Sequence, residues 1–396
     1  MAGRSPWLKQ YQSQPQAFYK GGDTLFHVAL TIHLVGNDEG TAYYGLQSLF
    51  PAMCKLNELF APSHIRFFIE GDLNYINNSS YHDHETVHEG AEMMFANNRP
   101  NTLNVYFVQN PAGNCGYNLP YAGIANSIAC SGPNDVTWAH EVGHALSLPH
   151  PFLGWEGGVS WDGSVDHDFN SPAPERVTYN YTFFQQTYFP PDTLIIDTAY
   201  VEKVDGSNCA IAADGFCDTP PDYLASRWSC NGNGLSNTLQ TDPNGERFQS
   251  EGSFVMNYAN DRCQTRFSEE QIAAMRAFLH DQRSNWLRSR GYDLPITESV
   301  RPTAPEDGVS PPANATLLSW TSATHATNYL VQVSRLSSFP GAVTQTYVTS
   351  DTSIVLPELA VGRTYYWRVL PYNNLGGCQD FTPRRSFLTS DFVNST

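Results

Sequence analysis

The pattern of apolar and polar residues predicts alternating strands and helices in the first third of the chain. Apolar side chains alternate with polar ones over residues 26–34, which predicts a strand with one buried face, and the alternation recurs over 65–69 and 103–107. Residues 46–60 carry apolar side chains at helical spacing, and residues 84–97 also look helical. We therefore expect a mixed sheet with helices.

After residue 150 the sequence predicts a turn-rich region, then a helix, then a linker. Residues 151–250 are acidic and rich in turn-forming residues, so little regular structure is expected there. Ser268 and Gln271 form a capping box that starts a helix, which we expect to extend to about Arg290. Proline and charged residues are frequent over 294–312, which is typical of a linker.

The last part of the chain consists of short predicted strands. Tyr365 to Val369, within TYYWRVLPYNNLG, looks like the sixth strand of a fibronectin type III sandwich, with buried tryptophan and tyrosine as its core. The fold class is therefore α+β followed by an all-β sandwich. The expected organisation is an N-terminal arm (1–21), a main domain (22–293) with upper (22–150) and lower (151–293) subdomains, a linker (294–312) and the sandwich (313–396).

Composition narrows the classes of partner. The 396 residues carry a formal net charge of -17, which argues against nucleic acid and anionic membranes as partners. No stretch is long and apolar enough to be a transmembrane helix, and the first residues lack the apolar core of a signal peptide. Eight cysteines permit disulfides, and none has the C-x-x-C spacing of a structural zinc site.

The stretch VTWAHEVGHALSLPH, residues 136–150, carries the strongest chemical signal. On a helix, His140 and His144 lie on the same face, so both imidazoles can bind one metal ion. A turn after the helix can bring His150 to the same ion, and Glu141 can act as base towards a metal-bound water. Three histidines with an open fourth position are typical of catalytic zinc. The alternative is a buried helix whose histidines bond to backbone groups.

Ser147 departs from the long zinc signature H-E-x-x-H-x-x-G-x-x-H, which has glycine at this position. Glycine allows the helix to end in a left-handed backbone conformation, and serine adopts that conformation at a cost of roughly 1 kcal/mol. The departure removes no metal ligand. A separate histidine-rich stretch over 82–88 is more typical of a solvated polar loop than of a second metal site.

Several blocks together resemble the pappalysin branch of the metzincin proteases. They are HEVGHALSLPH, then GSNC with DGFCDTPPDY over 206–223, then SFVMNYANDRC, and then RFSEEQIAAM. Their order and spacing match over roughly residues 22–290. The resemblance implies a secreted zinc endopeptidase whose two-part metzincin catalytic domain is split by a cleft, with the zinc helix at that cleft.

The resemblance also implies roles for individual residues near the metal. SFVMNY is similar to the methionine turn beneath the zinc, so Met256 would be a packing floor for the imidazoles and Tyr258 would stabilise the oxyanion. In metzincins the wall after this turn lines the substrate pocket just beyond the cut bond, which places Asp261 and Arg262 in that pocket. Taken alone, SFVMNY would be a buried core strand.

Two further features come from the same resemblance. Asp214, Asp218 and Thr219 lie in a block similar to a calcium-binding loop of the family, although a turn held by side-chain-to-backbone bonds is an equal alternative. Asp242 with its neighbours is a weaker calcium candidate. Residues 113–130 correspond to the sheet edge to which a peptide substrate adds as an antiparallel strand, or else form an ordinary glycine-rich loop.

Family resemblance pairs Cys230 with Cys263 and, as a second choice, Cys209 with Cys217. Two further cysteines, Cys115 and Cys130, are paired by guess. Cys54 and Cys378 are left as free cysteines.

The sequence therefore predicts a secreted or cell-surface zinc endopeptidase that hydrolyses peptide bonds of extended protein substrates through a metal-activated water. Zinc is the expected cofactor, with calcium as a second ion, and the partner is a protein or peptide. The alternative is a binding or adhesion protein on a weakly active or inactive protease scaffold, which Ser147 and the appended sandwich suggest. A zinc hydrolase of small substrates is disfavoured by the metzincin features.

Overall fold

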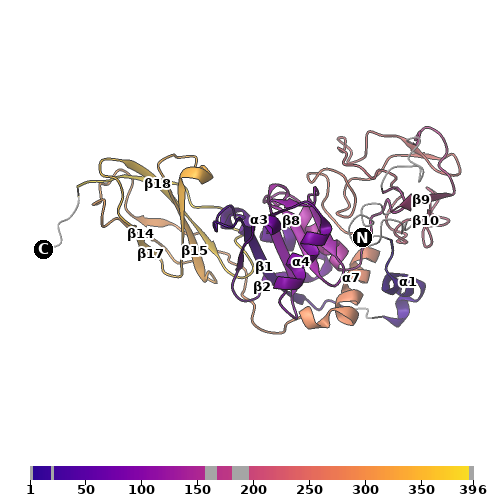
Figure 1. Cartoon of the computed structure of the whole chain (residues 1–396), viewed down its shortest axis with the longest axis horizontal. Helices are drawn as coiled ribbons and strands as arrows, with labels where there is room; N and C mark the ends of the chain where they lie inside the picture. Colours follow the sequence, from indigo (N-terminus) through magenta and orange to yellow (C-terminus); the bar gives the residue numbers. More distant parts are fainter. Residues whose placement is uncertain (1–2, 19–21, 157–166, 181–195, 392–396) are drawn as a thin grey trace. The chain divides into compact units, whose positions relative to one another are not determined.

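The computed structural model describes residues 3–18, 22–156, 167–180 and 196–391. The ends of the predicted arm and sandwich, and parts of the lower subdomain, lie outside these residues. The chain divides into two compact units, one formed by residues 1–44 and 55–289 and the other by residues 45–54 and 290–396. The division falls within helix α2 (Leu46–Phe60). Figure 1 shows the whole chain, coloured along the sequence.

The first unit is built on a six-stranded sheet with the order β2–β1–β5–β8–β7, in which β3 also pairs with β1. All pairs are parallel except β7, which is antiparallel to β8. Strand β7 therefore lies at an edge of the sheet. The strands are β1 (Phe26–Gly36), β2 (Ile65–Ile69), β3 (Asn74–Asn77), β5 (Leu103–Val108), β7 (Gly116–Leu119) and β8 (Gly123–Ser127).

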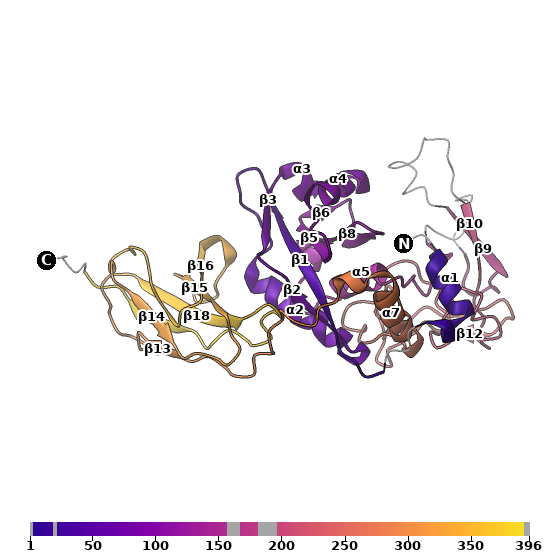
Figure 2. The same cartoon turned by 90° about the horizontal axis from the view of Figure 1, so that it is seen from below.

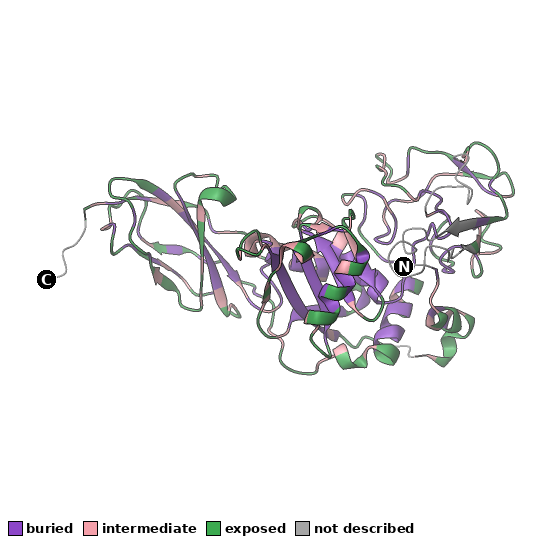
Figure 3. Cartoon of the chain, in the orientation of Figure 1, coloured by how far each residue is buried: buried purple, intermediate pink, exposed green. Residues whose placement is uncertain are grey.

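The three predicted strands are confirmed, but the expectation that the first has only one buried face is wrong. Strand β1 is central and buried along nearly its whole length, as Figure 3 shows for the sheet. Its polar residues bond to the neighbouring strand, since the Thr31 hydroxyl lies 2.7 Å from that of Thr102 and His33 Nε2 lies 2.9 Å from Asn104 Oδ1. Because these groups satisfy each other, polar positions can occupy the second buried face.

Helices surround this sheet, and their ends follow local capping signals. Helix α4 begins with a capping box between Thr86 and Glu89. The capping box of Ser268 and Gln271 likewise starts helix α7, but the expected extension to about Arg290 is wrong. The helices of this unit are α1 (Pro6–Ser13), α3 (Ser79–His82), α4 (Val87–Asn97), α5 (Thr137–Ala145), α7 (Glu269–Gln282) and the last part of α2, from residue 55 onwards.

Helix α7 ends at Gln282 because Arg283 leaves helical geometry, with a φ of -136°, and a short 3-10 turn, Ser284–Trp286, follows. Helix α1 of the N-terminal arm lies beside α7 (Figure 2), where the rings of Trp7 and Phe278 meet edge to face with centroids 4.9 Å apart.

Residues after α5 form the loop-rich region that the sequence predicts. The region packs around a small aromatic core that includes Phe152, Trp155 and Tyr223. Its strands β9 and β10 form an antiparallel pair at the outer side of the region (Figure 1). The short strands of this unit are β4 (Asp83–His84), β6 (Asn110–Pro111), β9 (Arg176–Asn180), β10 (Ile196–Tyr200), β11 (Gln240–Thr241) and β12 (Arg247–Phe248).

The second unit contains a fibronectin type III-like sandwich of seven strands. One sheet has the order β13–β14–β17 and the other β16–β15–β18–β19. Strand β18 is the sixth strand, as expected, and Trp367 is completely buried in the core between the sheets. The strands are β13 (Pro302–Ala304), β14 (Leu317–Trp320), β15 (Asn328–Ser334), β16 (Thr344–Thr349), β17 (Ser353–Val355), β18 (Thr364–Tyr372) and β19 (Arg385–Leu388).

The predicted linker over 294–312 is partly wrong, because much of it belongs to the sandwich. Ile296 and Val300 are buried in the sandwich core, and β13 pairs with β14. Proline does not prevent this, because β13 lies at the edge of its sheet, where a missing N–H is tolerated.

Four disulfides are present, which corrects one prediction. Cys54 and Cys378 are not free but bonded to each other, across a sequence separation of 324 residues and within the second unit. The other three predicted pairs are confirmed. Disulfides of this number are typical of extracellular proteins. Within the described residues, no helix is long and apolar enough to cross a membrane. The remaining pairs are Cys115–Cys130, Cys209–Cys217 and Cys230–Cys263.

Candidate metal centre

Three buried histidines converge at the end of helix α5. His140 and His144 lie on one face of the helix, and His150 reaches back to them from the following turn. The Nε2 atom of His150 lies 3.1 Å from Nε2 of His140 and 3.0 Å from Nε2 of His144. In the part of the chain that the structure describes, these residues form the one group of three or more His, Cys, Asp or Glu side chains with metal-binding geometry.

The hydrogen bonds of the other ring nitrogens show what this arrangement can bind. Nδ1 of His140 lies 2.8 Å from the carbonyl oxygen of Val255, and Nδ1 of His144 lies 2.7 Å from that of Leu148. Carbonyl oxygens only accept, so each Nδ1 carries the proton and each Nε2 presents a lone pair. Two lone pairs directed at a third imidazole nitrogen are unfavourable unless a cation lies among them, and the donor set therefore fits a metal ion.

Electrostatics favours the neutral imidazoles that a metal requires. Burial lowers the pKa of His140 to about 4 and lowers the pKa values of His144 and His150 well below the usual range, because a charged imidazolium is poorly solvated there. The three imidazole rings are therefore neutral at neutral pH. They can bind a metal without first losing a proton.

Ser147 makes the turn that brings His150 to this position. Its φ is 76°, in the left-handed region that the zinc signature assigns to glycine. The Leu148 N–H donates to the carbonyl of Gly143 at 3.0 Å, which closes the end of the helix. The Ser147 hydroxyl lies 2.7 Å from the hydroxyl of Ser5, so the N-terminal arm is bonded to the same turn.

Glu156 is a partner of His150 that sequence reasoning missed. Its Oε1 lies 3.2 Å from Nδ1 of His150, and its Oε2 accepts the N–H of Gly154 at 2.7 Å. A carboxylate at Nδ1 keeps the proton on that nitrogen and leaves Nε2 free to bind a metal. The only signal in the sequence is an acidic residue shortly after His150, in a region without regular structure, so the contact could not be deduced.

Glu141 faces the edge strand β7. A Cβ atom on Gly116 would lie 2.9 Å from Cγ of Glu141, so glycine is required for this close approach. Oε2 of Glu141 is buried and has no hydrogen-bond partner among the described residues. Burial raises the pKa of Glu141 to about 8. Such a carboxyl group is suited to exchange protons near neutral pH.

Met256 and Tyr258 both lie close to the histidine helix or its imidazoles. A Cβ atom on Gly143 would meet the sulfur of Met256 before any other atom. The methionine therefore packs directly against α5. The ring of Tyr258 lies 4.9 Å from that of His150 and 5.8 Å from that of His140, between centroids. Burial, with the neighbouring Glu141, raises the pKa of the Tyr258 hydroxyl above its usual range, so it remains a proton donor.

Asp261 and Arg262, the predicted pocket residues, differ in their surroundings. Asp261 Oδ1 accepts the N–H of Val136 at 2.9 Å, just before α5, and its other oxygen pairs with Arg227. The carboxylate therefore holds the start of the histidine helix. Arg262 is exposed. Their role in substrate selection stays a prediction.

The predicted calcium loop is only partly assembled. Asp214 is buried and accepts the Thr219 hydroxyl at 3.1 Å, whereas Asp218 points to the start of α7 and accepts the N–H of Glu270 at 2.8 Å. Asp242 accepts the N–H of Glu246 at 2.8 Å, as in a turn held by its own side chain. Calcium binding stays a prediction.

The sequence predicts that the histidine-rich stretch over 82–88 is a solvated loop, and this prediction is wrong for His82 and His84. His82 and His84 are buried, and their Nδ1 atoms lie 2.8 Å and 2.9 Å from the carbonyl oxygens of Val35 and Tyr81. These bonds satisfy the rings within the fold.

Comparisons with known proteins reach only part of the chain. No family model matches it, and no curated protein matches it. A solved Fn3-like protein from Clostridium thermocellum is 21% identical, with 24% of this chain and 98% of that chain covered and a TM-score of 0.18. The fn3 domain of human collagen alpha-1(XX) is 21% identical, with 28% and 97% covered and a TM-score of 0.18.

A third solved structure is the sixth fibronectin type III domain of human fibronectin type III domain containing protein 3. It is 17% identical, with 24% of this chain and 94% of that chain covered and a TM-score of 0.18. The description of the second unit as a fibronectin type III-like sandwich rests on its own strand order.

Proposed function

We propose that this protein is a secreted zinc endopeptidase of the pappalysin type. The observation that carries the proposal is the convergence of three buried, neutral imidazole nitrogens beside a buried carboxyl group, Glu141. Nitrogen donors in this number suit zinc with an open coordination position. Zinc, when bound, supplies Lewis acidity that polarises a carbonyl group and favours ionisation of water.

The chain's own residues would supply the proton transfers and the positioning. Glu141 would take the proton of the attacking water and donate it to the departing amine, a role that suits a carboxyl group with a pKa of about 8. The Tyr258 hydroxyl, which is protonated, would donate to the oxyanion. An extended peptide would pair with the edge strand β7, next to which Glu141 lies.

The test compares cleavage of a quenched-fluorescent peptide library by the wild-type protein and by Glu141→Gln, each with zinc and with a chelator. We expect wild-type cleavage that stops with chelator and returns with added zinc, and a variant that still binds zinc but has lost nearly all cleavage. Retained cleavage in Glu141→Gln would refute the assigned base. No cleavage by folded, zinc-loaded wild type would favour the alternative, a binding protein on a protease scaffold.

A further inference from the structure

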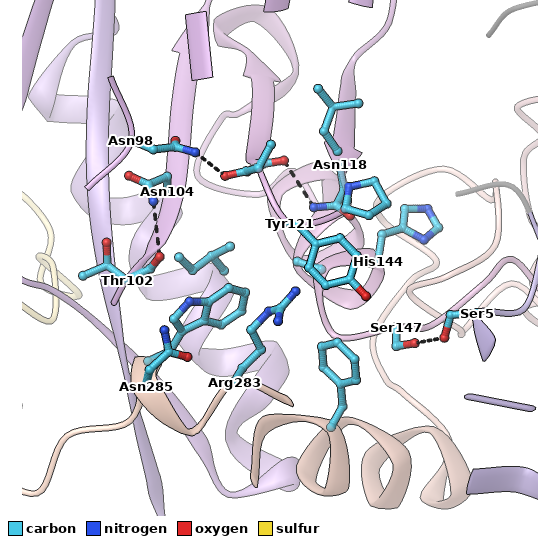
Figure 4. Close-up of a pocket in the computed structure, with 18 of the residues that line it drawn as sticks. Ser5, Asn98, Thr102, Asn104, Asn118, Tyr121, His144, Ser147, Arg283 and Asn285 are labelled. Carbon is cyan, nitrogen blue, oxygen red and sulfur yellow. Dashed lines mark hydrogen bonds between the residues drawn. The ribbon is translucent and has the colours of Figure 1, made fainter. Parts of the chain in front are cut away.

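A large pocket begins at the histidine site. It has a volume of about 930 Å³ and is lined by the loop that leads into β5, the turn between β7 and β8, residues of α5 and α7, and the N-terminal arm (Figure 4). His144 and Ala145 belong to its wall, as do Ser147 and Ser5 with their shared hydrogen bond. All of these residues belong to the first unit.

The pocket is basic in a strongly acidic protein. The chain has 39 aspartate and glutamate residues against 22 lysine and arginine residues, yet among the described residues the pocket wall contains Arg99 and Arg283 and no acidic side chain. Asp281, the acidic residue closest in sequence to Arg283, accepts the indole N–H of Trp7 at 2.6 Å. A ligand with a negative charge would therefore find no like charge in the described part of the wall.

Arg283 is held in place by aromatic rings and has an unused hydrogen-bond donor. Its guanidinium carbon lies 4.8 Å from the ring centroid of Tyr121, 5.1 Å from Trp286 and 5.4 Å from Phe278. One terminal nitrogen donates to the carbonyl of Gln282 at 2.9 Å. The Nε atom is buried without a hydrogen-bond partner in the described part of the chain. A carboxylate is the acceptor that best matches a fixed guanidinium group.

The direction of β7 indicates which residue of a bound peptide, counted from the cleaved bond, would enter this pocket. The strand begins at Gly116, beside Glu141, and ends at Leu119, which lines the pocket together with Tyr121. A peptide paired antiparallel to β7 runs from the Leu119 end towards the Gly116 end. Residues on the amino side of the bond at Glu141 therefore extend towards the pocket. With a rise of about 3.3 Å per residue, the side chain that enters it lies roughly three to five positions before that bond.

We propose that this pocket is a subsite for an acidic residue, aspartate or glutamate, on the amino side of the cleaved bond. Its position relative to the bond rests on the proposed function. Its preference for a carboxylate rests on Arg283, Arg99 and the absence of acidic residues from the pocket wall that the structure describes. The substrates would then be proteins with an acidic residue a few positions before an exposed, extended cleavage site.

The first experiment uses pairs of end-blocked peptides that differ only by glutamate or glutamine at one of these positions. We expect wild-type kcat/KM to be about 10- to 100-fold higher for the glutamate peptide. The preference should be lost in Arg283→Gln and weakened in Arg99→Gln. Arg283→Lys keeps a charge but not the planar fork, and should give an intermediate preference. Arg335→Gln, an exposed change in the sandwich, is the control and should leave the ratio unchanged.

The second experiment measures binding of the same peptides to metal-free protein through the fluorescence of Trp7 and Trp286, which line the pocket. Tighter binding of the glutamate peptide by wild type than by Arg283→Gln would support the subsite even if no peptide were cleaved and the proposed function failed. Cleavage without any preference for glutamate, together with equal binding of both peptides, would overturn the subsite and leave the proposed function standing. The wild-type ratio decides the question even if Arg283→Gln fails to fold.

Discussion

Glu156 offers a sharp test of how the histidine site is held ready for metal. Its two carboxylate oxygens have separate partners, the His150 Nδ1 at 3.2 Å and the Gly154 N–H at 2.7 Å. The Glu156→Gln variant keeps the shape of the side chain but has one accepting oxygen instead of two. If that oxygen accepts the Gly154 N–H, the amide NH₂ faces His150 Nδ1. The proton of His150 then moves to Nε2, where a metal would bind.

The expected loss of zinc affinity follows from the proton on His150 Nε2, which competes with the metal. Loss of a carboxylate that orients a metal-binding histidine typically weakens metal affinity by about 10- to 100-fold, or about 1.4–2.7 kcal/mol. Glu156→Gln should therefore raise the dissociation constant for zinc by this factor. Thermal unfolding of the metal-free protein should change much less, because both hydrogen bonds can still form, the one to His150 with its direction reversed.

The assay is competition for zinc between the protein and a chelating indicator of known affinity. Glu39→Gln, an exposed glutamate in the turn after β1, removes the same charge elsewhere and serves as the matched control. Equal zinc affinity in wild type and Glu156→Gln, with the metal-free proteins equally stable, would refute the reasoning. It would show that His150 keeps its orientation without the carboxylate.

Three further predictions concern stability. Gly143→Ala should destabilise the fold by about 1–3 kcal/mol in chemical denaturation, because its Cβ would meet the sulfur of Met256; a gain in stability, usual for alanine in a helix, would contradict that packing. Ser147→Gly relieves the left-handed backbone but loses the hydrogen bond to Ser5, so in wild type it should change the free energy of unfolding very little. In a Ser5→Ala background that bond is already absent, and Ser147→Gly should stabilise the fold by about 1 kcal/mol. Burial raises the pKa of Asp214 from 3.8 to about 7, so between these pH values the folded chain binds more protons than the unfolded chain. The melting temperature should therefore fall as pH rises through this interval, and bound calcium should prevent the fall. No effect of calcium, or the same fall in Asp214→Asn, would contradict this.

Local features of the fold followed from the sequence because neighbouring residues alone determine them. The spacing of His140 and His144 places them on one helical face wherever that helix lies. The left-handed conformation of Ser147 follows in the same way from the helix end that the signature requires. The capping box of Ser268 and Gln271 and the sixth strand of the sandwich were likewise predicted from short windows.

Other features depended on distant residues and were missed. The burial of β1 on both faces depends on pairing of His33 with Asn104, whose positions in the sheet are set by strand order. Helix α7 loses helical geometry at Arg283, whose side chain packs on the ring of Tyr121 from a distant segment. A pocket lined by such segments has no periodic signature in the sequence.

The disulfide between Cys54 and Cys378 has a consequence for how the purified protein should be handled. The bond encloses most of the chain in one covalent loop, since its cysteines are 324 residues apart. Any single cut within that loop, including one made by a protease on its own copies, leaves the pieces attached. A sample already nicked would migrate as one band on a non-reducing gel and would separate into fragments only after reduction. Intact and cleaved molecules therefore have to be distinguished under reducing conditions.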